Sequence, residues 1–510
     1  MKWVQNKQGF TIVELLIVIV VIGILAAITI AAYTGISNRA AQSVAQTAAQ
    51  QANKKIQTFA ISNNETAPDT LATINIASDN TTNYQYTLIS SASRPNQYCV
   101  TTTVKTFSYY IGYDMSTNTW VTNPKEGACP DHFAANSKVK QVVGSYDYQC
   151  LIASDNLPYC WGQGGEHLGI ASSSGNYVYN PTKVSTTGAL NGKTVKVIGI
   201  AGDQGMSTRH TCVIASDDLP YCWGNAHLGT ASPTSSNVPV AVTTSGVLSG
   251  KTVTALAVGY NHTCVTASDG RAYCWGYQAD GQLGTGVSGN STTPLAVDAF
   301  GVLSGKQLKQ IYAGYNHTCA VSSDGLGYCW GANNYGQLGT GTSGSASLAP
   351  VAVKMTGALA GKTIRTMTVG TTNSCAIASD GKAYCWGGNF SGENGNAVTA
   401  SQPEPVAVDA TGVLSGKTIL SIASASPNLY RYGTCVVASD LRSYCWGTQH
   451  TSTNNSTTNV PVLLSNGADM NGVLSKRAVH GSAGMFVIGG DGELYRYGYF
   501  NADPVKVVLP

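Results

Sequence analysis

The sequence has few charged residues and almost no net charge. Asp, Glu, Lys and Arg together make up 11% of the 510 residues, and the formal net charge is +3. An excess this small is too weak to argue for nucleic acid or an anionic surface as the partner. We therefore expect no nucleic-acid partner.

Familiar catalytic and ion-binding motifs are also missing. The chain contains no P-loop, no G-x-S-x-G elbow, no H-E-x-x-H pair and no EF-hand loop. Their absence lowers the expectation of catalysis without excluding it. We expect a protein that is not an enzyme, with no metal and no cofactor.

Glycine and cysteine are abundant. There are 57 Gly and 14 Cys in a chain of 510 residues, which is too long for one ordinary hydrophobic core. The glycine favours turn-rich β structure. An even number of regularly spaced cysteines indicates an exported protein with a disulfide framework.

The chain begins with a short basic leader and a long apolar segment. Lys2 and Lys7 precede Gly9-Phe10, and an unbroken apolar run covers residues 15–32. A run of this length can cross a bilayer as a helix, with the lysines on the cytoplasmic side. Glu14 lies near the start of the segment, where a carboxylate is costly unless it has a partner. The alternative is a plain signal anchor.

This arrangement resembles the class III leader of type IV prepilins and pseudopilins. The resemblance implies that prepilin peptidase cleaves between Gly9 and Phe10 and that the new Phe10 amine is N-methylated. It also implies that Glu14 neutralises the Phe10 amine of a neighbouring subunit in the filament. Both charges would lie where water is excluded, so each needs the other.

Residues 10–135 are expected to form an α+β pilin after a leader at 1–9. Small apolar residues recur at helical spacing and predict one helix over 10–62, of which 10–32 spans the membrane or forms the filament core; they are Ala41, Val44, Ala45, Ala48 and Ala52. The second half of this helix is expected to be amphipathic and to lie against a small sheet through these residues. Aromatic and β-branched runs within 63–135 predict a small antiparallel sheet. Cys99 and Cys129 flank its last three runs and are paired here, as in the C-terminal loop of pilins. Two free thiols are the alternative.

Residues 136–510 are built from a repeat. Each of six copies contains Cys, nine residues, and Cys-Trp-Gly, and a seventh has Phe486 and Arg496 at the cysteine positions. Every copy has four strand candidates, the last of which begins at a proline in all seven copies. Seven units of four short strands predict an all-β propeller with seven blades.

Two segments of the fourth copy resemble a known family of repeats. Residues 313–319 (Ala-Gly-Tyr-Asn-His-Thr-Cys) and 330–339 (Trp-Gly-Ala-Asn-Asn-Tyr-Gly-Gln-Leu-Gly) resemble the regulator of chromosome condensation repeat. The resemblance implies a seven-bladed propeller. The cysteines and copies 1, 2, 6 and 7 depart from the pattern.

The cysteine spacing itself predicts a disulfide across a hairpin. With Gly270 left-handed in a three-residue loop, Cys264 faces Cys274 on the neighbouring strand, where Cα atoms are ~4.5 Å apart. Each such bond should contribute ~2–3 kcal/mol. Asn156 and Asp218 can replace the glycine; Leu441 has no such explanation. Zinc ligation is the disfavoured alternative. The predicted pairs are Cys150–Cys160, Cys212–Cys222, Cys264–Cys274, Cys319–Cys329, Cys375–Cys385 and Cys435–Cys445.

Other chemically suggestive residues are interpreted as structural. Three histidines lie two residues before a cysteine, and we expect hydrogen-bonded repeat positions rather than a metal site: His210, His262 and His317. The six tryptophans after the second cysteines are expected in the core between blades. Asp280, Asp298 and Glu393 are scattered rather than paired.

The two halves together suggest a minor type IV pilin. The helix would place the chain in the cytoplasmic membrane before assembly and among other pilin subunits on the cell surface afterwards. A head this large would clash along a packed shaft, which favours the pilus tip, where the propeller would recognise an extracellular protein, glycan or surface. A secretion pseudopilin that recognises cargo and a pilin-anchored enzyme are the alternatives. Recognition is expected in five Ser/Thr/Asn-rich loops, at 164–180, 231–237, 343–349, 388–402 and 449–459.

Overall fold

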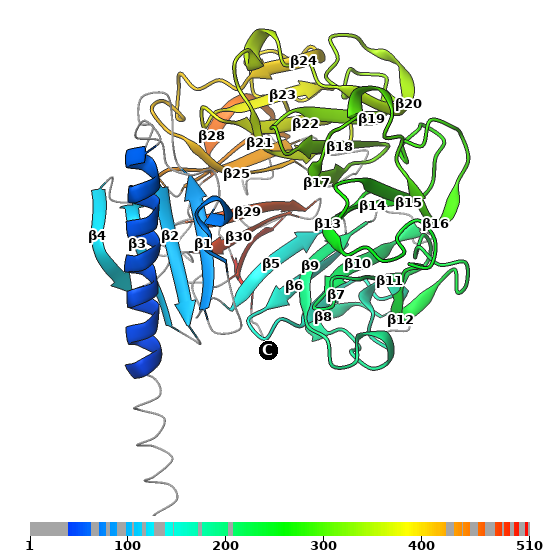
Figure 1. Ribbon diagram of the computed structural model, residues 1–510. Coiled ribbons are helices and arrows are strands. Elements are labelled where there is room, and N and C mark those ends of the chain that lie inside the picture. The colour runs from blue at the N-terminus through cyan, green and yellow to red at the C-terminus, as the bar shows by residue number, and fades with distance from the viewer. Residues whose placement is uncertain are drawn as a thin grey trace, which may run out of the picture.

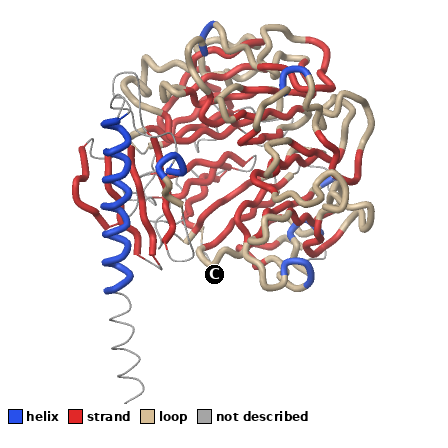
Figure 2. Tube along the Cα trace, in the orientation of Figure 1, coloured by secondary structure: helices blue, strands red, loops and turns tan. Residues whose placement is uncertain are grey.

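The computed structural model has a helix with a small sheet beside it, followed by a ring of four-stranded sheets (Figures 1 and 2). It describes residues 39–62, 71–77, 82–88, 98–104, 107–114, 119–126, 138–145, 147–171, 176–201, 208–424, 433–440, 442–448, 457–464, 475–481, 484–489, 494–498 and 505–507. Gly9, Phe10, Glu14 and the predicted membrane span at 10–32 lie outside these residues. Within them, no helix is long and apolar enough to cross a membrane.

The N-terminal unit packs a helix against four antiparallel strands. The helix covers residues 39–62, and the sheet has the order β1-β2-β3-β4. Its elements are η1 (Leu71–Ile74), β1 (Thr82–Leu88), β2 (Tyr98–Val104), β3 (Phe107–Asp114) and β4 (Thr119–Glu126). The α+β arrangement predicted for this part of the chain is therefore present.

Small side chains let the helix approach the sheet closely. Ala49, Ala52 and Ile56 are buried in one cluster with Val100 and Ile111 of the sheet. The Thr102 hydroxyl donates to the Ala45 carbonyl at 2.7 Å, and the Tyr98 hydroxyl donates to Asn53 Oδ1 at 2.6 Å. Four predicted contact positions, Ala41, Ala45, Ala48 and Ala52, are buried. The prediction was wrong for Val44, which is 49% exposed because it turns away from the stripe that Ala45, Ala49, Ala52 and Ile56 form.

The head consists of consecutive four-stranded antiparallel sheets. The sheets, in chain order, are β5 (Val139–Gly144), β6 (Tyr148–Ala153), β7 (Pro158–Gly162) and β8 (Val178–Lys183); β9 (Val195–Ile200), β10 (His210–Ala215), β11 (Pro220–Gly224) and β12 (Ser236–Ala241); β13 (Val253–Val258), β14 (His262–Ala267), β15 (Ala272–Gly276) and β16 (Ser291–Ala296); β17 (Leu308–Ala313), β18 (His317–Ser322), β19 (Gly327–Asn333) and β20 (Gly344–Ala352); β21 (Ile364–Val369), β22 (Asn373–Ala378), β23 (Ala383–Gly387) and β24 (Gln402–Ala407); β25 (Ile419–Ser424), β26 (Gly433–Ala438), β27 (Ser443–Thr448) and β28 (Thr457–Leu463); β29 (Ser475–Gly481), β30 (Gly484–Gly489), β31 (Leu494–Gly498) and β32 (Val505–Lys506). Short 3₁₀ turns occur at η2 (Glu166–Leu168), η3 (Gly188–Leu190), η5 (Gly301–Leu303) and η6 (Gly357–Leu359).

The sheets are arranged as a β-propeller. The first strand of each sheet contacts the first strands of the neighbouring sheets, so these strands form the inner ring, and β29 contacts both β25 and β5. Second and third strands are almost entirely buried, whereas the fourth strands are the exposed outer edges. The all-β propeller predicted for the second half of the chain is confirmed.

The outer strands begin earlier than predicted. Residues 343–349 were expected to form a loop, but β20 begins at Gly344 because it continues to pair with the long β19, with Gly344 opposite Asn333. The predicted start at proline was also wrong for β16, which begins at Ser291, three residues before Pro294. Proline has no N–H to donate, but it is tolerated within an edge strand whose outer side faces solvent.

Candidate recognition surface

The antiparallel order of each sheet sorts its connections onto two faces. Connections from the first to the second strand and from the third to the fourth lie at one end of the sheet; we call this end the loop face. In the sheet β13–β16 these connections are residues 259–261 and 277–290. The hairpins between second and third strands, such as 268–271, and the links to the next sheet, such as 297–307, lie on the opposite end, the hairpin face.

Four of the five predicted recognition loops connect a third strand to a fourth strand, and the other, 343–349, lies almost entirely at the start of the fourth strand β20. The topology therefore brings them to the loop face, although they are separated by up to about 290 residues in the sequence. Most of four loops is described, whereas residues 449–456 of the fifth lie outside the described part. Sequence spacing alone did not show that the five loops share one end of the head.

The hairpins have the register that the cysteine spacing predicted. Cys264 lies opposite Cys274, Gly270 has a φ of +72°, and the Ala267 N–H donates to the Arg271 carbonyl at 3.0 Å. Asn156 and Asp218 take positive φ at the same place in their hairpins, as predicted; Leu441 lies outside the described residues.

Each disulfide predicted for the propeller is present; we call these bonds staples. The bonds are Cys150–Cys160, Cys212–Cys222, Cys264–Cys274, Cys319–Cys329, Cys375–Cys385 and Cys435–Cys445, with Cα atoms 4.0–4.1 Å apart. In the N-terminal unit Cys99 is disulfide-bonded. Cys129 lies outside the described residues, so its pairing with Cys99 stays a prediction. No cysteine in the described part of the chain is a free thiol.

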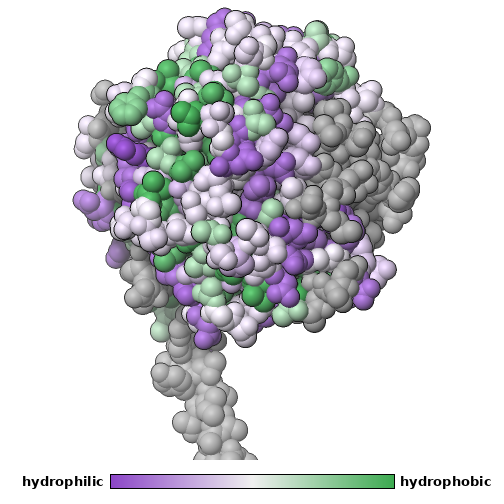
Figure 3. All heavy atoms as spheres, turned by 90° about the vertical axis from the view of Figure 1, so that its right-hand side faces the viewer, coloured by the Kyte–Doolittle hydropathy of each residue, from purple (hydrophilic) through white to green (hydrophobic). Residues whose placement is uncertain are grey.

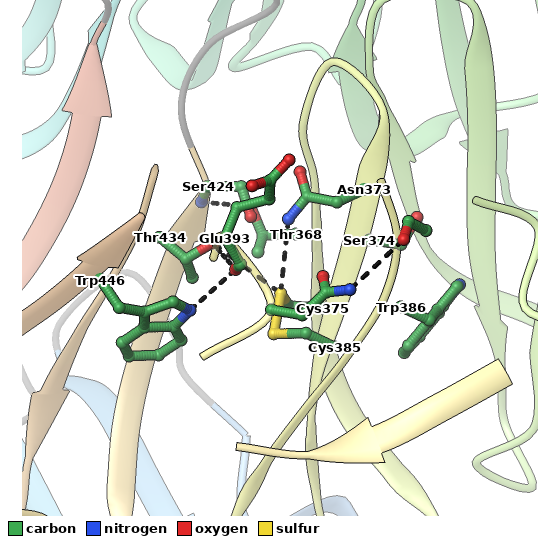
Figure 4. The surroundings of a disulfide bond; sticks show 12 residues. Thr368, Asn373, Ser374, Cys375, Cys385, Trp386, Glu393, Ser424, Thr434 and Trp446 are labelled. Atoms are coloured by element: carbon green, nitrogen blue, oxygen red, sulfur yellow. Dashed lines mark hydrogen bonds between the residues drawn. A yellow bond between two sulfur atoms is a disulfide. The ribbon is translucent and has the colours of Figure 1, made fainter. Parts of the chain in front are cut away.

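The predicted inter-sheet role of the tryptophans is confirmed. Trp330 is fully buried, and its indole N–H donates to the Gln282 carbonyl of the preceding sheet at 2.9 Å. The same bond joins Trp446 to the Glu393 carbonyl, next to the Cys375–Cys385 disulfide (Figure 4). Trp161, Trp223, Trp275 and Trp386 are also buried. These rings are therefore unavailable for stacking on a ligand.

The histidines also hold neighbouring sheets together. Thr318 Oγ1 donates to the Gln282 carbonyl at 2.8 Å, so it accepts at 2.8 Å from Nε2 of His262, which must carry the proton. His210 and His317 make the same contact with Thr263 and Ser374 of the next sheet. Burial lowers the pKa of His262, His210 and His317 to about 3, so all three are neutral near pH 7.

The predicted scattered carboxylates each have a separate local role. Asp280 accepts from Asn316 Nδ2 at 2.6 Å, and Asp298 accepts from the Phe300 N–H at 2.9 Å. Glu393 is fully buried and accepts from the N–H groups of Phe390 and Ser391; burial raises its pKa. Across the described residues, no three His, Cys, Asp or Glu side chains are grouped so that they could hold a metal ion.

Buried amides shape the long loops from within. Gln278 donates to the Val287 carbonyl at 2.8 Å and accepts from the Leu283 N–H at 2.6 Å. Asn333 and Asn389 make the equivalent pair of contacts in the next two loops. The start of each loop is therefore tied through one side chain to two points further along the loop, which gives the loop face a defined shape.

Aromatic side chains link the loops of adjacent sheets. Tyr260 and Tyr315 are stacked, with ring centroids 4.2 Å apart, and Tyr335 makes an edge contact with Phe390 at 4.8 Å. Phe390 is 51% exposed, while Tyr335 and Tyr277 are each 38% exposed. Sequence analysis missed this set as a group, because its members come from different loop positions. The one available signal was the presence of aromatic residues in otherwise polar loops.

Another exposed aromatic pair lies at the outer strand β8, where Tyr177 and Tyr179 have ring centroids 4.8 Å apart and are 47% and 80% exposed. On the side turned to the viewer in Figure 3, hydrophobic residues are mixed with hydrophilic ones. Among the described loop residues, the aromatic side chains of three consecutive sheets, Tyr260, Tyr277, Tyr315, Tyr335 and Phe390, therefore form the candidate recognition surface.

Comparison with known proteins agrees with both halves of the chain. Residues 4–30 match the prokaryotic N-terminal methylation motif. Regulator of chromosome condensation (RCC1) repeat models match residues 253–282, 308–337 and 364–393, and 269–321 and 324–377. Together the repeat matches cover less than half of the chain.

Curated relatives match slightly more than half of the chain. The chain is 26% identical over 281 residues to the ultraviolet-B receptor UVR8 of Arabidopsis thaliana, covering 54% of this chain and 59% of the receptor. It is 26% identical over 303 residues to the E3 ubiquitin-protein ligase HERC2 of Homo sapiens, covering 59% of this chain and 6% of the ligase. The chain thus spans less than two thirds of either relative.

Solved structures share the fold of the head. Yeast RCC1 (Prp20), in a complex with Kap60, has a TM-score of 0.56 at 19% identity, covering 72% of this chain and 83% of that one. Human WBSCR16 has a TM-score of 0.55 at 17% identity, covering 70% and 87%. The chain is therefore similar to RCC1-repeat propellers in its head and to N-methylated prokaryotic proteins in its first thirty residues.

Proposed function

We propose that this chain is a minor type IV pilin that carries a recognition propeller at the tip of the pilus. The observation that carries the proposal is the succession of an N-terminal methylation motif at residues 4–30 and an oxidised propeller in one chain. The motif supplies anchoring and assembly through Phe10 and Glu14, with prepilin peptidase and other pilin subunits as partners. The disulfides suit a location outside the cytoplasm.

The head is proposed to have seven blades, with β29–β32 as the last. The support is the double contact of β29 with β25 and β5. In addition, Ile488 and Leu494 are buried with residues of the first sheet, and Tyr495 is buried with residues of the sheet β25–β28. The ring would then close by side-chain packing, because every sheet is made of four consecutive strands.

Recognition is proposed to occur on the loop face, through the aromatic surface defined above. Partly exposed rings beside Ser, Thr and Asn can stack on a ligand and hydrogen-bond to it, while the buried amides limit the ordering cost on binding. No catalytic role is proposed for the head.

Two measurements test this function. Immunogold labelling of the head should mark pilus ends, and even labelling along the shaft would contradict the tip placement. Replacing Tyr335 and Phe390 by Ala should reduce adherence of piliated cells, without changing the number of pili. Phe300→Ala is the matched control, because Phe300 is 84% exposed on the opposite face. Equal adherence of all variants would contradict recognition by the loop face. Loss of a secreted protein, with no surface filament visible, would instead favour the secretion pseudopilin.

A further inference from the structure

A β-bulge occurs near the start of the first strand in every sheet of the head. In β13 the ladder pairs Val253 with Ala267 and Ala255 with Thr266, so Thr254 has no residue opposite it. The same shift leaves out Lys309 in β17 and Arg365 in β21. A bulge residue is released from the pleat and its side chain can be turned out of the sheet.

The bulge positions are mostly basic. In chain order, they are Lys140, Lys196, Thr254, Lys309, Arg365, Leu420 and Lys476. Among those with described side chains, Lys196, Thr254, Lys309 and Arg365 are exposed and Lys140 is half-buried. Because the first strands form the inner ring and enter it from the hairpin face, these residues surround the axis of the head on that face.

Carboxylates in the neighbouring hairpins already have other donors. Asp324 accepts from Lys306 Nζ at 2.7 Å and from the Ser322 hydroxyl. Asp380 accepts from the Tyr384 hydroxyl at 2.6 Å and the Lys382 N–H at 3.1 Å. In the first two sheets the bulge lysines bond to their own hairpins, Lys140 to Asn156 at 2.5 Å and Lys196 to Asp218 at 2.6 Å. Lys309 and Arg365 are the exposed basic bulge residues of the fourth and fifth sheets.

We infer that this ring of bulge residues binds an acidic polysaccharide on the hairpin face. Several cations around one axis match a ligand that carries repeated anionic groups, since a single anion would reach only one or two of them. A nucleic acid is less well matched. Grooves that bind single strands combine basic residues with aromatic rings for the bases, and no bulge position is aromatic.

Binding of defined polymers by the mature full-length protein in detergent tests the inference. Wild-type protein should bind alginate and dextran sulfate but not neutral dextran, and binding should weaken as salt is added. Lys309→Gln with Arg365→Gln should lower affinity by about tenfold, since rim charges of this kind contribute modestly each. The control removes two exposed charges elsewhere, Lys54→Gln on the N-terminal helix and Lys183→Gln at the end of β8, and should leave affinity unchanged.

A gain-of-charge variant tests the same inference without relying on a loss of binding, which misfolding could also cause. Thr254→Lys adds a cation at an exposed bulge position and should raise affinity for both acidic polymers several-fold. The inference is overturned if wild-type protein binds neither acidic polymer, if the control loses as much affinity as the bulge variant, or if single-stranded DNA binds more tightly than alginate and dextran sulfate. The Tyr335 and Phe390 variants should bind these polymers normally, so failure here leaves the loop-face proposal standing.

Discussion

The last sheet of the head differs from the sheets that precede it in how its central hairpin is held. In β14 and β15, Cys264 faces Cys274 and the two are bonded; in β30 and β31, Phe486 faces Arg496 in the same register. The hairpin can therefore form without the covalent bond. Like the other sheets, the last one is packed on both sides, through Ile488 and Leu494 toward the first sheet and Tyr495 toward β25–β28, but it has only this packing.

This comparison indicates that the staples add stability to a fold that the repeat already specifies. A disulfide restricts the unfolded conformations of its own hairpin, whether or not the neighbouring sheets are folded. Packing, by contrast, stabilises the last sheet only while both neighbouring sheets are in place. Opening of the ring should therefore begin next to β29–β32.

The largest effect is expected from the staple beside the last sheet. Cys435→Ala with Cys445→Ala should lower the free energy of unfolding of the head by more than the ~2–3 kcal/mol expected for a ten-residue loop, because both cysteines share a buried cluster with Tyr495. Cys264→Ala with Cys274→Ala is the control, because this pair is also buried against the next sheet but both neighbouring sheets carry a disulfide, so its loss should be smaller. Denaturant unfolding of oxidised protein measures both. Equal losses would contradict a weak point at the last sheet.

The contacts between neighbouring sheets, which we call joints, can be disrupted without changing a cysteine. Gly284 has a φ of +67°, and a Cβ there would lie 2.6 Å from Nε1 of the next sheet's Trp330. We expect Gly284→Ala to cost roughly 2–4 kcal/mol, from backbone strain and overpacking together. Gly301 has a φ of +62° and nothing within 4 Å of the added Cβ, so Gly301→Ala isolates the strain. If thermal unfolding shows the same loss for both variants, the Trp330 contact does not hold the joint.

Supplying the missing staple should stabilise the last sheet. Phe486→Cys with Arg496→Cys places two thiols in the register that the other sheets use, with the same separation of ten residues. We expect a gain of ~1–3 kcal/mol under oxidising conditions, lost again on reduction, and slower hydrogen exchange in β29–β31. Stabilisation that persists after reduction would show that it does not come from the disulfide.

The buried histidines between neighbouring sheets should make the head less stable at acidic pH. The pKa of His317 is lowered by burial to about 3 from an ordinary value of 6.5, so its contribution is complete above about pH 6.5 and is lost as the pH falls toward 3. His317→Asn copies Asn373, which occupies the equivalent position one sheet later. The variant should reduce the slope of stability against pH by up to about 1.4 kcal/mol per pH unit in that interval.

A second variant separates titration from hydrogen bonding in this joint. Ser374→Ala removes the hydroxyl 3.0 Å from His317 Nε2 but leaves the imidazole in place. Urea unfolding at pH 7, 5.5 and 4 should show lower stability for this variant with an undiminished slope. If His317→Asn leaves the slope unchanged, the histidine does not take up its proton on unfolding.

Sequence reasoning succeeded where the signal was local and repeated. The ten-residue cysteine spacing fixed the hairpin register and six disulfides, and the positive φ of Asn156 and Asp218 followed from the same turn. The histidine and tryptophan roles followed from their recurrence. In the N-terminal unit, the spacing of the alanines predicted which face of the helix is buried, and only Val44 was wrong.

What the sequence could not supply depends on contacts between repeats and on which end of a sheet a residue occupies. The Tyr335–Phe390 contact joins different positions of two loops, so no spacing rule links them. The bulge at Lys309 arises from the register between β17 and β18, which composition does not reveal. Likewise a net charge of +3 concealed the basic residues around one end of the head. The domain boundaries and the roles of Gly9, Phe10 and Glu14 stay predictions.

The central claim, an N-terminally processed pilin with a stapled propeller head, is tested most directly by intact mass spectrometry of the native protein from the cell surface, alkylated without reductant. The account predicts a chain that begins at a methylated Phe10 and carries no alkyl group on its 14 cysteines. A chain that retains residues 1–9, or cysteines of the head that alkylate freely, would contradict it.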